Sequence, residues 1–126
     1  MHLLAENHEA LRLATSSETL LNASLESFAV RLESHRLVAE VVFRLRHSKR
    51  VKRLLLRFQD VAAFQFAHSQ GYTFYNVESF KFLPVPNGYY LSLDPVDESD
   101  HADERDGDTI RADSVQAYEL SESDSN

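Results

Sequence analysis

The stretch 37–46, LVAEVVFRLR, decides the fold class of this 126-residue chain. One set of alternate positions is wholly apolar, whereas the other set carries Glu40, Arg44 and Arg46. An alternation with a period of two is typical of a strand that buries one face and exposes the other. The stretch therefore predicts a half-buried strand of an antiparallel sheet.

The same period of two continues on both sides of this strand. Residues 27–32 alternate before the polar turn 33–36, and residues 53–58 alternate after the turn 47–50. After a bend at 61–63, we expect a further strand that begins at Phe64 and Phe66. After a turn near Gly71, we expect strands in two parts of 72–83, at 89–93 and at 109–120.

The segment Pro84–Gly88 is the clearest hairpin signal in the chain. Asn87 and Gly88 suit the two central positions of a type I′ turn, because both residues adopt a positive φ at little cost. This pair predicts a hairpin whose partner strand begins at Tyr89.

Residues 3–21 have a different period. Leu4, Leu11, Ala14 and Leu21 form a stripe at helical spacing. The hydroxyl side chains at 15–17 compete for backbone hydrogen bonds, so we expect a break there.

Together these segments predict a single α+β domain that is mainly β. The N-terminal helical segment spans 1–22, and the β domain spans 23–120 with an acidic loop at 94–108. A disordered tail spans 121–126. The strand segments predict a seven- to eight-stranded antiparallel sandwich or a partly open barrel.

Composition excludes several functional classes. There is no cysteine, which rules out disulfides, thiolate metal sites and cysteine nucleophiles. The N-terminal segment lacks the pattern of a signal peptide, and the chain has no apolar run long enough to span a bilayer. We therefore expect a cytoplasmic protein.

The charges are divided along the chain. Residues 1–93 carry 11 Lys and Arg against 8 Asp and Glu, or +3, whereas residues 94–126 carry 2 against 12, or −10, which sums to the net −7. A basic segment, residues 44–57, contains no acid. Its cations are Arg44, Arg46, Lys49, Arg50, Lys52, Arg53 and Arg57.

Three interpretations of the basic segment remain open. It can bind phosphate or an acidic partner, it can be a solvated hairpin protected from aggregation by charge, or the acidic loop can dock on it. The net charge of −7 disfavours nucleic acid, because nucleic-acid affinity comes mainly from neutralising phosphates.

The acidic loop and the following hairpin supply the candidate protein-binding residues. Tyrosines near a hairpin tip suit binding, because a rigid amphipathic ring loses little entropy. A calcium loop with Gly107 at its sixth position would place Ala102 where the motif needs Asp, so no metal site is predicted. The candidates are Asp97, Glu98, Asp100, Asp103, Glu104, Asp106 and Asp108, with Tyr89 and Tyr90.

Catalytic motifs are missing from the sequence. The six histidines show neither helical metal-pair spacing nor an H-x-H pair, and the three glycines are too far apart to form a phosphate-binding loop. A catalytic site assembled from distant residues leaves no local motif. We predict no enzyme activity, no catalytic residue and no cofactor.

The segments Asn22–Ser24, Leu56–Val61 and Ile110–Val115 carry a family resemblance. A polar entry into two alternating strands, a segment L-x-F-x-x-V and a late strand I-x-A-x-x-V resemble a group of small uncharacterised bacterial β proteins. Some similar families are thought to be immunity proteins, which bind and block a toxin domain. The N-terminal helical segment and the acidic residues 97–108 depart from that group.

The functional hypothesis is a non-enzymatic protein-interaction module. The resemblance implies an immunity protein that binds a basic toxin surface through its acidic loop. The alternative is a nucleic-acid or phosphate-ligand binding protein that uses the hairpin 44–57. No membrane partner is expected, and the oligomeric state is not predicted.

Overall fold

The computed structural model describes residues 1–66 and 75–124. Within them the chain forms eight strands and one short helix. No described helix is long and apolar enough to cross a membrane. The predicted turn near Gly71 and the predicted strand around Phe74 lie outside the described residues. The elements are β1 (His2–Glu6), α1 (Asn7–Thr15), β2 (Ser24–Glu33), β3 (Arg36–Arg44), β4 (Arg53–Gln65), β5 (Tyr75–Asn76), β6 (Lys81–Val85), β7 (Gly88–Asp94) and β8 (Gly107–Leu120).

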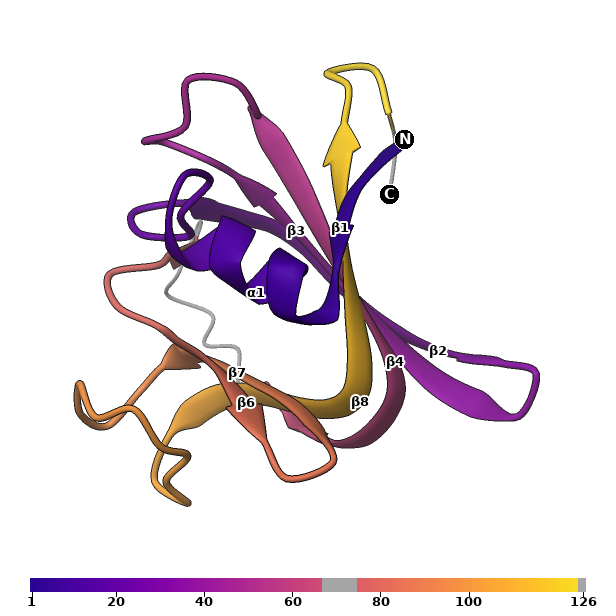
Figure 1. Ribbon diagram of the computed structural model, residues 1–126, viewed down its shortest axis with the longest axis vertical. Coiled ribbons are helices and arrows are strands. Elements are labelled where there is room, and N and C mark those ends of the chain that lie inside the picture. Colours follow the sequence, from indigo (N-terminus) through magenta and orange to yellow (C-terminus); the bar gives the residue numbers. More distant parts are fainter. Residues whose placement is uncertain (67–74, 125–126) are drawn as a thin grey trace.

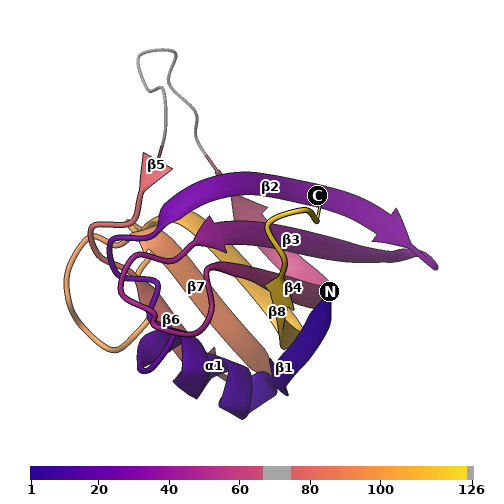
Figure 2. The ribbon, with the colours of Figure 1, turned by 90° about the horizontal axis from the view of Figure 1, so that it is seen from above.

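The strands form one antiparallel sheet in the order β5-β2-β3-β4-β8-β7-β6. β8 pairs with β4 along its whole length, and its other edge pairs first with β7 and then with β1. Figures 1 and 2 show that the sheet is open and strongly curved, with α1 lying across its hollow side. The predicted α+β, mainly β class is confirmed, and the open sheet corresponds to the partly open form of that prediction.

The expected helix over residues 3–21 was wrong in its first part. Residues 2–6 are the strand β1, because they pair with the free edge of β8 at 116–119. Asn7 then turns the chain with a φ of 52°, and its Oδ1 accepts a hydrogen bond from the backbone N–H of Val115. Tertiary pairing has outweighed the helix propensity of the leucines in β1.

The helix α1 ends at the predicted break. The hydroxyl of Thr15 donates to the carbonyl of Leu11, and the hydroxyl of Ser16 donates to the carbonyl of Arg12. Such bonds offer the backbone an alternative to another helical turn. The helix therefore covers only nine residues and buries Ala10 and Ala14.

A single long strand, β4, replaces the predicted bend at 61–63 and the separate strand at Phe64. Asp60 has a φ of 56°, and the pairing with β8 shifts register between Val61 and Ala63. A shift of this kind bends a strand without ending it. β4 therefore continues to Gln65 and curves the sheet.

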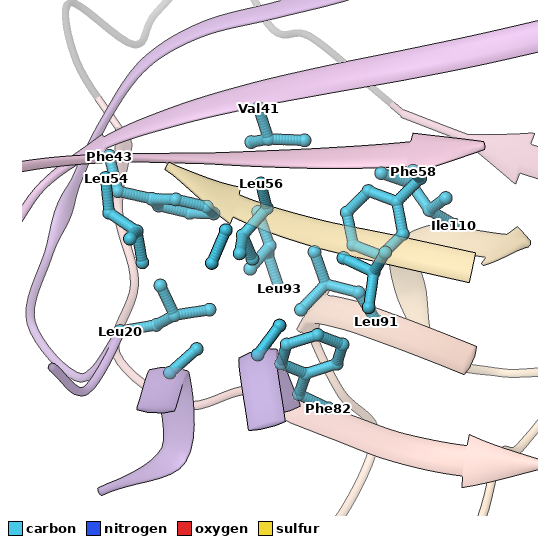
Figure 3. Close-up of a cluster of buried hydrophobic side chains, with 14 of the residues drawn as sticks. Leu20, Val41, Phe43, Leu54, Leu56, Phe58, Phe82, Leu91, Leu93 and Ile110 are labelled. Carbon is cyan, nitrogen blue, oxygen red and sulfur yellow. The ribbon is translucent and has the colours of Figure 1, made fainter. Parts of the chain in front are cut away.

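The core lies between the hollow face of the sheet and α1. The alternation predicted from sequence places Val41, Phe43, Leu56 and Phe58 on this face, where they are fully buried. Figure 3 shows Leu20 and Phe82 closing the same cluster, with Leu91 and Leu93 between the two sides. Among the described residues, the opposite face carries a small apolar cluster, made of Val42, Leu55 and Leu120 with Tyr118 packed against it.

The β6–β7 hairpin is where it was predicted, but its turn is not type I′. Val85 pairs with Gly88, so Pro86 and Asn87 are the central residues, and only Asn87 has a positive φ, 66°. Proline followed by such a residue is the signature of a type II turn. Gly88 is required for a different reason: a Cβ there would lie 2.1 Å from the carbonyl oxygen of Ala112.

Candidate interaction surface

A buried carboxylate, Asp106, fixes the acidic loop (residues 94–108). Its side chain is fully buried, and both of its oxygens lie 3.0–3.1 Å from the ammonium of Lys81. The hydroxyl of Tyr90 donates to Oδ2 at 2.7 Å. The backbone N–H groups of Val96 and Asp103 donate to Oδ1 and Oδ2 at 2.9 and 3.0 Å. One side chain therefore joins both arms of the loop to the sheet.

Lys81 completes this anchor from β6. It is 3% exposed, and besides Asp106 it contacts Asp97 Oδ1 at 3.0 Å and donates to the carbonyl of His101 at 3.0 Å. A buried charge is tolerated when it is paired and hydrogen-bonded, as this ammonium is. Lys81 was not among the residues predicted from the sequence, although a lone lysine between Phe80 and Phe82 is a signal of such a role.

The electrostatics keep the anchor ionised. Burial opposes ionisation of Asp106, but the hydrogen bonds from Val96, Tyr90, Asp103 and Lys81 outweigh it and lower its pKa. Burial likewise opposes the charge of Lys81, yet its bonds to the carboxylates raise its pKa. The loop thus stays attached as an ion pair at neutral pH.

Short local turns shape the outer part of the loop. Asp97 accepts bonds from the hydroxyl and the N–H of Ser99, and these bonds together with Lys81 lower its pKa to about 2. Asp103 accepts from the guanidinium and the N–H of Arg105, which holds its pKa well below the usual range. Side-chain bonds of this type stabilise turns without a strand or helix.

The structure separates the predicted acidic residues into two groups. Asp106 and Asp108 are buried, and Asp103 is half-buried against Arg105. The exposed group is Asp97, Glu98, Asp100 and Glu104. In the described part of the chain, Glu98 and Glu104 form no ion pair, and Asp100 lies only beside His101, at 3.9 Å. Three carboxylates are therefore available to a partner.

The two predicted tyrosines lie beneath the surface. Tyr89 is buried with its ring edge-on to His8, at 5.4 Å between centroids. Tyr90 is 4% exposed, its hydroxyl bonds Asp106, and the guanidinium of Arg111 lies 5.2 Å from its ring centroid. Beside this ring a hollow of about 300 Å³ opens between β8 and the loop. Tyr90 therefore supports the loop from below, whereas Tyr89 packs in the main core.

The predicted basic patch is also divided. Arg44 and Arg53 share Glu26 across strands at 2.8 and 2.9 Å, and Arg57 pairs with Glu33 and Glu40. These arginines are largely neutralised on the outer face of the sheet. The remaining four, Arg46, Lys49, Arg50 and Lys52, are exposed in the β3–β4 connection, a basic loop of residues 46–52, and none has an ion pair among the described residues.

The acidic loop and the basic loop lie at opposite ends of the molecule. In Figure 1 the orange acidic loop is at the lower left and the β3–β4 connection is at the upper left. Docking of the acidic loop on the basic segment, one of the interpretations of the sequence, is therefore wrong. The internal partner of the acidic loop is Lys81, in β6.

Neither a metal nor a relative indicates the function. Across residues 1–66 and 75–124, no group of three or more His, Asp or Glu side chains is placed to hold a metal ion. Comparison with protein-family models, with curated protein sequences and with solved structures finds no match. The geometry of the two loops is therefore the main indication of function.

Proposed function

We propose that this chain is a non-enzymatic protein-interaction module that binds a basic partner surface through its acidic loop. The observation that carries the proposal is the anchoring of the loop by buried Asp106 to Lys81, Tyr90 and two backbone N–H groups. The anchor uses its charges inside the protein, so the exposed carboxylates of the loop stay available to a partner.

Preorganisation gives such a loop an advantage in binding. A flexible loop loses conformational entropy when it is ordered in a complex, whereas a loop already held by internal bonds loses less. The exposed carboxylates Glu98, Asp100 and Glu104 extend from a chain of net charge −7. A field of that sign steers a basic partner toward the molecule and speeds association at low salt.

The resemblance to immunity proteins adds a partner class to this proposal. A toxin domain that cleaves nucleic acid needs a basic cleft to hold phosphates. An acidic loop held in a fixed shape would fill that cleft and compete with the substrate. The partner proposed here is therefore a protein with a basic cleft, and a toxin domain is its specific form.

A charge-neutralised triple variant tests the proposal. Glu98→Gln, Asp100→Asn and Glu104→Gln remove three exposed charges but keep the anchor. The matched control removes three exposed charges elsewhere, with Glu78→Gln, Asp113→Asn and Glu122→Gln. Each variant loses three negative charges, so the two have the same net charge.

The assay measures affinity for the protein captured from cells by the wild-type chain and then purified. We expect the loop variant to bind about 10- to 100-fold more weakly, from three charge contacts of about 0.5–1 kcal/mol each, with a reduced salt dependence. The control should change affinity by less than about threefold. Equal affinities for the loop variant and the control would refute the proposal.

The basic loop supports the second candidate function, binding of nucleic acid or a phosphate ligand. Its specific observation is the four exposed cations at 46–52 that have no ion pair among the described residues. Filter binding with single- and double-stranded oligonucleotides at low salt tests it. Retention that disappears in the variant Arg46→Ser, Lys49→Ser and Arg50→Ser would favour this candidate over the acidic loop.

A further inference from the structure

The strand β1 has one edge that carries no strand in the described structure. Its other edge pairs with β8 at residues 116–119. Figures 1 and 2 show β1 at the rim of the molecule, beside the end of β8, with α1 leading away from it. A strand edge of this kind presents unpaired backbone N–H and C=O groups.

A groove lies along β1. It is an open hollow of about 660 Å³, lined by Leu3, Leu4, Ala5 and Glu6 from β1 and by Glu9, Arg12, Leu13, Ser16 and Ser17 from α1 and the residues after it. Successive side chains of a strand point to opposite faces. Leu3 lies opposite Tyr118 of the outer cluster, and Ala5 lies opposite Ala117 of the main core. Residues from both faces of β1 therefore line the groove, which means that the groove runs along the edge of the strand.

β1 lacks the protection found on the other terminal strands of the sheet. β5, at one end, has only two residues, and β6, at the other end, contains Pro84. A very short strand and a proline both discourage pairing with another chain. β1 has the sequence HLLAE, with Leu3 43% exposed and no proline. It is thus the terminal strand best suited to accept a partner.

We propose that the groove binds an extended segment of a partner protein, which adds to β1 as a further strand and lies against α1. This surface is separate from the acidic loop, and the proposal does not depend on that loop. A strand edge flanked by a helix gives affinity through main-chain hydrogen bonds and selectivity through side-chain pockets. Leu3, Leu4, Ala5 and Leu13 are the apolar residues of the groove.

Charge selects a basic segment. Arg12 pairs with Glu9 at 3.3 Å, which leaves the carboxylate of Glu6 without an ion pair among the described residues. The groove therefore carries one uncompensated negative charge. A segment that alternates apolar and basic residues would place its apolar side chains near Leu4 and a basic side chain near Glu6.

A second copy of this chain fits the groove less well. β1 shifts register between Leu3 and Ala5, so His2 faces the same side as Glu119, and Glu6 faces the same side as Gln116. Glu119 and Gln116 lie on opposite faces of β8. Antiparallel pairing of two β1 strands would therefore leave His2 and Glu6 of the two copies on different faces, with no charge complementarity.

The experiment uses the full chain and a synthetic ten-residue peptide of alternating valine and lysine. Peptide binding is followed by fluorescence polarisation and by the backbone amide signals in NMR spectra. We expect saturable binding, with the largest NMR shifts at residues 2–17. Methylation of alternate peptide nitrogens should weaken binding at least tenfold, because it removes the main-chain donors on one edge.

Two variants and a control locate the site. Glu6→Lys should weaken binding about fivefold, and Ser17→Trp should block it by filling the groove. Glu98→Lys makes the same charge change in the acidic loop and should leave affinity within about twofold. Each variant is accepted only if its circular dichroism matches that of the wild type.

Several results would overturn the proposal. These are no saturable binding up to millimolar peptide, equal binding of the methylated peptide, or NMR shifts confined to another surface. Concentration-dependent dimerisation that is lost in Glu6→Lys would assign the edge to a second copy instead. The loop variant Glu98→Lys separates failure here from failure of the acidic-loop proposal, because only the latter predicts that it weakens binding of the captured partner.

Discussion

Asp106→Asn, a nearly isosteric change, should destabilise the fold strongly. Oδ1 of Asp106 accepts from Lys81 and Val96, and Oδ2 accepts from Lys81, Tyr90 and Asp103. Asparagine has one acceptor oxygen and one amide group. In either orientation, at least one backbone N–H would therefore face the amide hydrogens instead of an oxygen.

The magnitude follows from the burial of both partners. Asp106 is fully buried at its side chain and Lys81 is 2% exposed there. Removing one member of such a pair costs about 3–5 kcal/mol, because the other charge stays buried and uncompensated. Lys81 keeps a contact with Asp97, so the lower end of that range, about 3 kcal/mol, is expected. This is a large part of the 5–15 kcal/mol typical of a whole domain.

Urea unfolding monitored by circular dichroism and tyrosine fluorescence measures this loss. The control is Asp100→Asn, which removes a fully exposed carboxylate from the same loop and should leave the midpoint unchanged. The double variant Lys81→Met with Asp106→Asn should be less destabilised than the sum of the single variants, since neither charge is then left alone. A single-variant loss below about 1 kcal/mol, or strict additivity, would refute the role given to this pair.

Three further predictions follow from local geometry. Gly88→Ala should destabilise the protein by about 3 kcal/mol or more, because its Cβ would lie 2.1 Å from the carbonyl oxygen of Ala112. Gly107→Ala should be less destabilising, because the nearest atom to its Cβ would be 3.1 Å away. Thermal unfolding of the two variants tests this difference. Asp97 has a folded-state pKa of about 2 against about 3.9 unfolded, so its contribution is present above pH 4 and is lost as the pH falls toward 2, which acid titration of loop amide signals will detect. Burial and the bond to Asp106 raise the pKa of Tyr90, so stability should fall as the pH rises above about 10, and the difference in absorbance at 295 nm between the wild type and Tyr90→Phe should show that Tyr90 ionises only on unfolding.

The alternation of apolar and polar residues predicted the central strands, because each side chain there lies either in the core or on the outer face. The alternation of 37–46 placed Val41 and Phe43 in the core and Glu40 and Arg44 outside. β1 was not predictable in this way. Its leucines favour a helix, and the reason for its extended form is the free edge of β8, more than 100 residues later in the chain.

The sequence predicted which acidic residues belong to the candidate surface, but not which of them are buried and which are exposed. All seven acids of 97–108 look alike in the sequence, yet Asp106 is the anchor whereas Glu98 is exposed. The difference depends on Lys81, 25 residues before Asp106. The pairing of the arginines of the basic segment could not be predicted for the same reason, because Glu26 and Glu33, to which they are paired, lie on a different strand.

The anchor itself argues for a requirement on the shape of the loop. A buried ion pair gives little net stability compared with apolar residues of the same volume, because both charges lose their hydration. An apolar pair at 81 and 106 would avoid this loss of hydration, but it would leave the hydroxyl of Tyr90 and two backbone N–H groups without their acceptor. It would not orient the loop, since methyl groups cannot accept hydrogen bonds from Val96 and Asp103. The pair is thus best explained by the specific conformation it imposes, which keeps Glu98, Asp100 and Glu104 on the outside of a loop whose like charges would otherwise drive it apart.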